Sequence, residues 1–246
     1  MRQIDKDIKE KRDTQYNDWA RKRPAYICLI IPVVLLVAMG INDYMETRMW
    51  GNVLIYLLSI STFSSALFFL LSFFLRDISK FYPGKILFCD RLKPTIRILY
   101  STDGTYSEEQ KANIRKKIKA KKDIDLQKYK PKTYQNKKYV KRVNEAVAWL
   151  LDVTRFDDIL FEYNCVYGFW RNLTGALLVD ALFVFGLAFF SICFYAPPLG
   201  SILLWIGLAI IFLSVVTTLV AYNNGRIFAK KVYDVFMNLD DDNNAY

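Results

Sequence analysis

Four long apolar runs constrain this chain more than any other feature. They cover Ala25–Ile41, Trp50–Leu75, Leu173–Tyr195 and Ser201–Tyr222, and their 88 residues contain one formal charge, Asp180. Runs of about 18 or more apolar residues are typical of helices that cross a lipid bilayer. We therefore predict a mainly α-helical polytopic membrane protein with four transmembrane helices, and the pattern excludes a soluble enzyme.

The distribution of basic residues predicts the orientation of these helices. Residues 1–24 contain eight Lys and Arg, residues 76–172 contain 22, and the last 24 residues contain three, whereas the two short loops contain only Arg48. Basic residues near span ends stay in the cytoplasm. We expect both termini and the middle segment inside. The predicted regions are an N-terminal arm (1–24), a first hairpin (25–75), a cytoplasmic domain (76–172), a second hairpin (173–222) and a tail (223–246).

The chain has no histidine, and its four cysteines form no CxxC pair. This composition removes Ser-His and Cys-His nucleophile pairs, and it argues against a zinc site or a disulfide framework. We therefore expect no catalytic residues, no metal and no cofactor, and we do not expect an enzyme.

The cytoplasmic domain is expected to be small and mostly helical, with an α+β character. Short β-prone stretches cover Lys85–Cys89 and Thr95–Tyr100, and a capping box at Ser107 and Gln110 predicts a helix start. Three helices are expected, over Ser107–Lys119, Lys138–Thr154 and Asp157–Asn172, the last continuing into the third span. The tail begins with Asn223-Asn224-Gly225, and a short helix is expected after these residues.

The first of these helices is strongly basic and is the predicted binding element. Segment 76–172 has 22 basic against 12 acidic residues, which attracts anions. The candidate partners are an anionic ligand such as a nucleotide, the bilayer surface, or a soluble partner protein. The sequence has no phosphate-binding glycine loop and no aromatic residues interleaved with the basic helix, so nucleic acid is not expected as a partner. The proposed binding residues are Lys111, Arg115, Lys116 and Lys119.

Asp180 is the only ionisable group inside a predicted span, and it should face the interior of the bundle. Its depth in the membrane predicts Ser214, Thr217 and Thr218 on the fourth span as partners. Two interpretations stay open, an ion or proton pathway and a hydrogen-bonded packing group. The second span is rich in serine and threonine, which favours close helix packing, a homo-oligomer interface or a pore lining.

A juxtamembrane stretch before the third span combines aromatic, amide and basic side chains. On a helix, Tyr163, Tyr167 and Arg171 share one stripe, and Asn164, Gly168 and Asn172 form the next. Glu162 precedes both stripes. This face suits close packing or stacking on a planar ligand, and we favour structural coupling between the cytoplasmic domain and the third span.

Segment 94–175 resembles an uncharacterised family of bacterial four-span membrane proteins. The shared features are a Pro-Thr entry, a serine-initiated helix, an EAVxWL helix followed by TR, and an ExNxxYGFxRN motif before a span. Here they are Pro94-Thr95, Ser107–Lys119, Glu145–Leu150 with Thr154-Arg155, and Glu162–Asn172. The family is similar in layout to membrane effectors of anti-phage defence.

The resemblance implies a multi-pass protein of the bacterial inner membrane, in which a cytoplasmic domain receives a signal and oligomeric spans perturb the membrane. Two alternatives remain at this point. One is a channel or transporter subunit that uses Asp180, and the other is a membrane scaffold that recruits a soluble partner.

Overall fold

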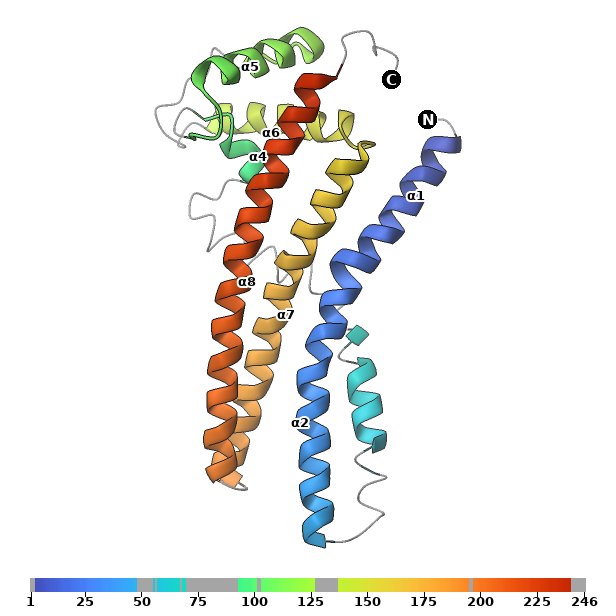
Figure 1. Cartoon of the computed structure of the whole chain (residues 1–246), viewed down its shortest axis with the longest axis vertical. Helices are drawn as coiled ribbons and strands as arrows, with labels where there is room; N and C mark the ends of the chain where they lie inside the picture. The colour runs from blue at the N-terminus through green and yellow to red at the C-terminus, as the bar shows by residue number, and fades with distance from the viewer. Residues whose placement is uncertain are drawn as a thin grey trace. The chain divides into compact units, whose positions relative to one another are not determined.

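The computed structural model describes residues 3–47, 55, 57–66, 68–69, 93–100, 103–126, 137–194 and 197–239, and every regular element in these ranges is helical (Figure 1). A shorter apolar helix covers Leu57–Ala66. The other elements are α1 (Gln3–Asn17), the π-helix η1 (Asp18–Lys22), α2 (Arg23–Thr47), α4 (Pro94–Arg97), α5 (Glu108–Lys122), α6 (Lys137–Val153), α7 (Asp158–Phe194) and α8 (Pro197–Asn238).

The N-terminal arm is helical and joins the first apolar run without a loop. The helices α1, η1 and α2 follow one another directly, and Pro32 lies inside α2. Between the two α-helices, η1 forms a single π-helical turn with Ala20 fully buried. Such turns are rare, because their hydrogen bonds span five residues, and they often mark functional positions.

Two of the helices, α7 and α8, are long and apolar enough to cross a membrane. Only 33% and 28% of their most apolar stretches are buried inside the structure. Large side chains point outward, with Leu182 73%, Trp205 74% and Phe212 71% exposed. Exposed apolar surface of this kind is typical of a membrane or protein interaction site, because its contact with water is unfavourable.

The chain divides into two compact units, which we call the apolar unit (residues 1–83 and 168–221) and the helical lobe (residues 84–167 and 222–246). Both α7 and α8 contribute residues to each unit. The core of the apolar unit contains small side chains such as Ala25, Ala176 and Ala188, which let helices approach closely. The core of the lobe is larger and includes Tyr139, Tyr233 and Phe236.

The expected strand over Thr95–Tyr100 is wrong. Pro94 lies in the first turn of α4, where its fixed φ angle suits a helix and its missing N–H costs nothing. Ile96, Ile98, Leu99 and Tyr100 are all buried, so the stretch lacks the alternation of a half-buried strand. The described residues of segment 76–172 therefore have no α+β character. The other expected strand, Lys85–Cys89, lies outside the described residues.

The short helix expected in the tail is the end of α8, which continues without interruption through Asn223-Asn224-Gly225 to Asn238. A Cβ atom on Gly225 would lie 2.9 Å from Cε2 of Tyr167. The glycine therefore provides space for a neighbouring ring within the lobe and does not end the helix.

The capping box that predicts the start of α5 is confirmed. The Ser107 hydroxyl accepts from the Gln110 amide N–H, and the Gln110 side chain accepts from the Ser107 N–H. The helix ends three residues later than expected, at Lys122, where Asp123 adopts the left-handed conformation with φ of 54°. The predictions of a helix over 138–154 and of a helix running from 157 into the third apolar run are confirmed by α6 and α7.

Candidate functional site

Two residues of the juxtamembrane motif, Gly168 and Asn172, contact the N-terminal helices α1 and η1 within the apolar unit. A Cβ atom on Gly168 would lie 2.6 Å from Oη of Tyr16 and 2.9 Å from Cβ of Ala20. One turn later, the Asn172 side-chain amide donates to the Ala20 carbonyl at 2.5 Å. The stripe Gly168–Asn172 therefore fits α7 closely against the π-helical turn.

The tyrosine of the same motif packs within the helical lobe. The Tyr167 ring lies parallel to the Phe228 ring, with centroids 6.3 Å apart, and it covers Gly225 on α8. Glu162 is exposed, whereas Tyr163, Asn164 and Arg171 are half-buried. Adjacent motif residues thus pack in different units, Tyr167 in the lobe and Gly168 in the apolar unit.

A buried seam of polar side chains lies between α7 and α8 in the apolar unit. The Thr174 and Thr217 hydroxyls are hydrogen-bonded to each other at 3.1 Å, and the Ser214 hydroxyl reaches the Thr174 carbonyl at 3.5 Å. Thr218 is buried as well, and its hydroxyl has no hydrogen bond among the described residues. The sequence analysis did not identify Thr174 as a member of this seam, although the residue comes only two positions after the end of the motif.

Asp180 is buried, at 1% exposed, but it does not pair with the residues predicted for it. Ser214 and Thr217 bond to Thr174 instead, because Thr174 comes almost two helical turns before Asp180 on α7. The Cys28 thiol of α2 interacts electrostatically with the Asp180 carboxyl. Neither carboxyl oxygen has a hydrogen bond of normal geometry to any described residue. Such a group is costly in an apolar setting and marks a candidate functional position.

Two of the four proposed ligand-binding cations are buried inside the helical lobe. Lys111 is 1% exposed, and its ammonium donates to the Tyr100 carbonyl at 2.8 Å, to the Asp103 carbonyl and to the Glu108 carboxylate at 3.0 Å. The Arg115 guanidinium donates to the Leu99 carbonyl at 3.1 Å. Both cations hold the segment that follows α4, so this conformation leaves them no surface for a ligand. Helical spacing gave no sign of this, because the acceptors are backbone groups outside the helix.

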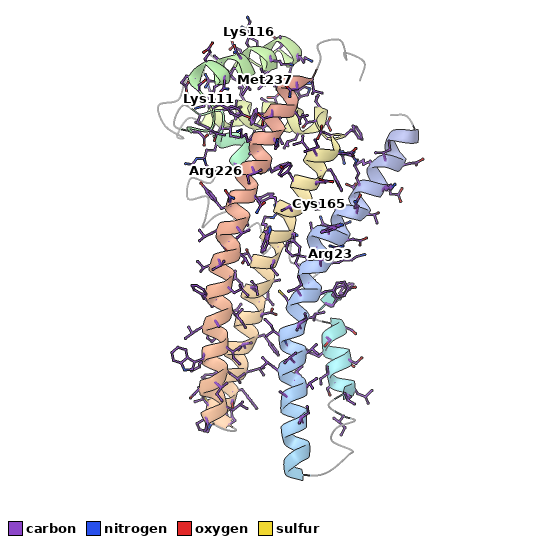
Figure 2. All side chains as sticks on the ribbon, viewed as in Figure 1. Arg23, Lys111, Lys116, Cys165, Arg226 and Met237 are labelled. Atoms are coloured by element: carbon purple, nitrogen blue, oxygen red, sulfur yellow. The ribbon has the colours of Figure 1, made fainter. Side chains whose placement is uncertain are left out.

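The other two proposed cations, Lys116 and Lys119, are exposed on α5. Figure 2 shows Lys116 on the side of α5 that points away from α6. Lys119 forms an ion pair with Asp125 at 3.5 Å. Between them, Lys117 donates to the carbonyls of Met237 and Leu239, at 3.0 and 2.6 Å, and so caps the end of α8.

Tyrosine hydroxyls attach α8 to the rest of the lobe. Tyr106 donates to the Asp234 carboxylate at 2.6 Å, and the buried Tyr233 donates to the Thr95 carbonyl at 2.6 Å. Burial raises the pKa of both phenols above the ordinary range, and the Asp234 carboxylate adds to the rise at Tyr106. Both hydroxyls therefore remain protonated donors at neutral pH.

A groove of about 620 Å³ lies between the end of α5 and the start of α6. Its charged lining residues are Lys122, Asp123, Lys138, Lys141, Arg142 and Glu145. Sequence reasoning missed it by concentrating on the cations of α5. A usable signal was present, since residues 138, 141, 142 and 145 recur on one face of a helix, opposite the apolar stripe.

Comparison with protein-family models, with curated proteins and with solved structures found no match to this chain. The resemblance of segment 94–175 to a bacterial membrane family therefore stays a prediction. Among the described residues, no group of three or more His, Cys, Asp or Glu side chains could hold a metal ion. The described residues thus present three candidate sites: the motif on α7, the polar seam around Asp180 and the basic groove.

Proposed function

We propose that the chain is an inner-membrane effector or sensor of a bacterium, with four spans, cytoplasmic termini and a cytoplasmic helical lobe that receives a signal. The signal changes the packing of the lobe, and α7 and α8 transmit the change to the spans. The spans, assembled as a homo-oligomer, then alter the permeability of the membrane. Anti-phage defence is the proposed setting, by the resemblance of the juxtamembrane motif.

The outward-facing apolar side chains support the membrane assignment. Leu182, Phe189 and Trp205 are each more than two-thirds exposed on α7 and α8. The helix α2 has a similar face, with Tyr26, Ile30, Val34, Val37 and Ile41 exposed at intervals of three or four residues. Burying such faces in lipid removes them from water at about 25 cal/mol per Å².

The observation that carries the proposal is the position of the motif on one helix. Tyr167 packs on Phe228, which lies against the core of the lobe, while Gly168 and Asn172 pack on α1 and η1 in the apolar unit. A change in the lobe that rotates or shifts α7 must disturb the close contact at Gly168, because a packed interface cannot deform continuously. A signal of this kind requires a ligand or partner that binds one of the two packings better than the other.

The exposed hydroxyl face of Leu57–Ala66 supports assembly of several copies. Ser59, Ser61, Thr62 and Ser65 are exposed, and the hydroxyls of Thr62 and Ser65 bond to carbonyls of their own helix at 2.9 Å. Small hydroxylic side chains that are satisfied locally let another helix approach closely in a membrane.

A second candidate function, a channel or transporter subunit, is favoured by Asp180. Its carboxyl is buried in the apolar unit without a hydrogen bond of normal geometry, and a simple anchor has no need of such a group. A carboxyl in this position can take up a proton or a cation during transport.

One experiment tests both candidates. Expression of the chain in bacteria during phage challenge should depolarise the membrane and reduce phage yield, measured with a potential-sensitive dye and plaque counts. Asp180→Asn should lower the dye response by about tenfold if the carboxyl lies on the conduction path. Ser201→Ala serves as the control, because the Ser201 hydroxyl is exposed and bonds to the Pro197 carbonyl of its own helix at 3.2 Å.

The outcomes separate the candidates. A parent chain that neither depolarises nor protects would reject the effector, and capture of a soluble partner by the full chain would then favour the scaffold. A folded Asp180→Asn variant with the parent's response would reject the channel and assign Asp180 to packing.

A further inference from the structure

The groove between α5 and α6 is a basic cavity whose lining residues belong neither to the motif on α7 nor to the polar seam around Asp180. It contains the side chains of Lys122, Lys138, Lys141 and Arg142, offset by two carboxylates, with the buried Ile124 also in its lining. Its volume of about 620 Å³ lies within the range of roughly 300–1,000 Å³ that is usual for small-molecule sites. The six charged side chains are all exposed, so a ligand can reach them from solvent.

Two elements bring these cations together. On α6, Lys138, Lys141 and Arg142 lie at positions i, i+3 and i+4 and therefore share one face. Lys122 is the last residue of α5, and the left-handed Asp123 turns the chain immediately after it. The groove is thus built from a helix end and a helix start.

The start of α6 has a charge arrangement that favours a bound anion. The first turn of this helix contains no acidic residue and includes Lys138. The amino end of a helix is electropositive, so cations there are unfavourable and anions are stabilised. By contrast, the first turn of α5 carries Glu108 and Glu109, which suit the electropositive end.

We propose that this groove binds a phosphate-bearing anion, and that Lys122 and Lys141 are its principal contacts. The lining carries four positive and two negative side chains, a net of +2, which matches a diphosphate better than a singly charged group. A soluble nucleotide polyphosphate and an anionic lipid headgroup share this chemistry. The site deepens the proposed function, since it would be where the lobe receives its signal. Anion binding itself does not depend on the proposed function, whereas the role of the bound anion as a signal does.

The same geometry excludes the interior of α5 as the anion site. Lys111 and Arg115 are buried, and they donate to backbone carbonyls of the segment after α4. An anion there would have to displace those bonds, whereas in the groove it meets exposed side chains that remain hydrated.

The test uses the full chain in nanodiscs of zwitterionic lipid, titrated with inorganic pyrophosphate and, in a separate arm, with a short-chain phosphatidylglycerol below its micelle concentration. Short-chain phosphatidylcholine is the blank. Binding is followed by thermophoresis for the parent and for Lys122→Glu, Lys141→Glu and the control Lys116→Glu. Lys116 is exposed on α5 and does not line the groove, so it matches the charge change without touching the site.

Each groove variant should weaken binding by at least about tenfold, and the control should change it by less than about twofold. Loss confined to the pyrophosphate arm assigns a soluble phosphate, and loss confined to the phosphatidylglycerol arm assigns a headgroup. Equal losses for all three variants, or no binding in either arm, would overturn the proposal. A groove variant that binds no anion but still depolarises cells would reject this site as the signal receiver and leave the effector function standing.

Discussion

At the level of single residues, the juxtamembrane motif is best explained by the space it leaves. Gly168 and Gly186 both lie inside α7, but they differ in their surroundings. An added Cβ atom meets Tyr16 and Ala20 at Gly168, whereas it meets nothing within 4 Å at Gly186. The two glycines therefore form a matched pair for testing close packing against backbone flexibility.

Gly168→Ala should destabilise the protein by about 1–3 kcal/mol, because the methyl group overlaps with the Tyr16 hydroxyl and the packed helices must separate. Gly186→Ala should instead be neutral or stabilising by up to about 1 kcal/mol, since alanine is the better helix former. Thermal unfolding in detergent measures both. Adding Tyr16→Phe, which removes the hydroxyl oxygen nearest to the added methyl, should restore part of the loss. Equal effects at the two glycines would contradict the packing role.

Cys165 gives the lobe a pH dependence whose sign follows from its burial. Burial raises the pKa of its thiol from 9.0 to about 11, and Glu162 adds to the rise. Between these values the unfolded chain releases the proton while the folded chain keeps it, so stability is complete below about pH 9 and falls as pH rises towards 11. The loss should reach about 2–3 kcal/mol.

Cys165→Ala should make stability fall less steeply with pH. The measured quantity is the difference in unfolding free energy between parent and variant from about pH 8 to about pH 11, a range that covers the thiol pKa of the unfolded chain and that of the folded chain. Taking the difference removes the contribution of Tyr106 and Tyr233, whose phenols also have raised pKa values. An unchanged slope in the variant would show that the thiol does not titrate differently in the two states.

At the level of elements, α5 acts as a clamp on the end of α8. Lys117 donates to the Met237 and Leu239 carbonyls, and its ammonium lies 5.6 Å from the centroid of the Phe236 ring. The last carbonyls of a helix lack partners within the helix and carry the negative end of its dipole. One lysine on a neighbouring helix thus satisfies groups that α8 cannot satisfy itself.

Lys117→Met should therefore loosen the last turn of α8 by about 1 kcal/mol while keeping most of the aliphatic stem packed. Amide hydrogen exchange of residues 235–238 should speed up about fivefold, and exchange in α6 should stay unchanged. Lys116→Met, one position along and exposed, is the control. The clamp would be refuted by unchanged exchange at the end of α8.

The elements also show which structural features could be read from the sequence. The start of α5 was predictable because Ser107 and Gln110 form a local capping box, and α6 was predictable from its apolar period. The continuation of α8 through Gly225 was not predictable, because this glycine makes room for the ring of Tyr167, which is distant in sequence. The same reason explains why several features of the candidate sites could not be predicted. The burial of Lys111, the pairing of Thr174 with Thr217 and the groove all depend on tertiary contacts that local pattern does not encode.

At the level of the whole molecule, charged and apolar surface lie on different helices. In the apolar unit, α7 and α8 expose leucine, phenylalanine and tryptophan, whereas α5 and α6 of the lobe and α1 of the apolar unit expose charged side chains. Translocating a segment with so many cations is costly, but a short loop without them crosses readily. The proposed orientation therefore places Lys116 in the cytoplasm and Pro197, the first residue of α8, outside.

Single cysteines placed in a cysteine-free version of the chain can test this orientation. Pro197→Cys should react with a membrane-impermeant maleimide in intact spheroplasts, and Lys116→Cys should react only after the membrane is opened. Both positions are exposed in the structure, so a lack of labelling reports the membrane barrier and not burial. Labelling of Lys116→Cys in sealed spheroplasts would place the lobe outside. The groove would then face a compartment without nucleotides, and the signalling proposal would fail with the topology.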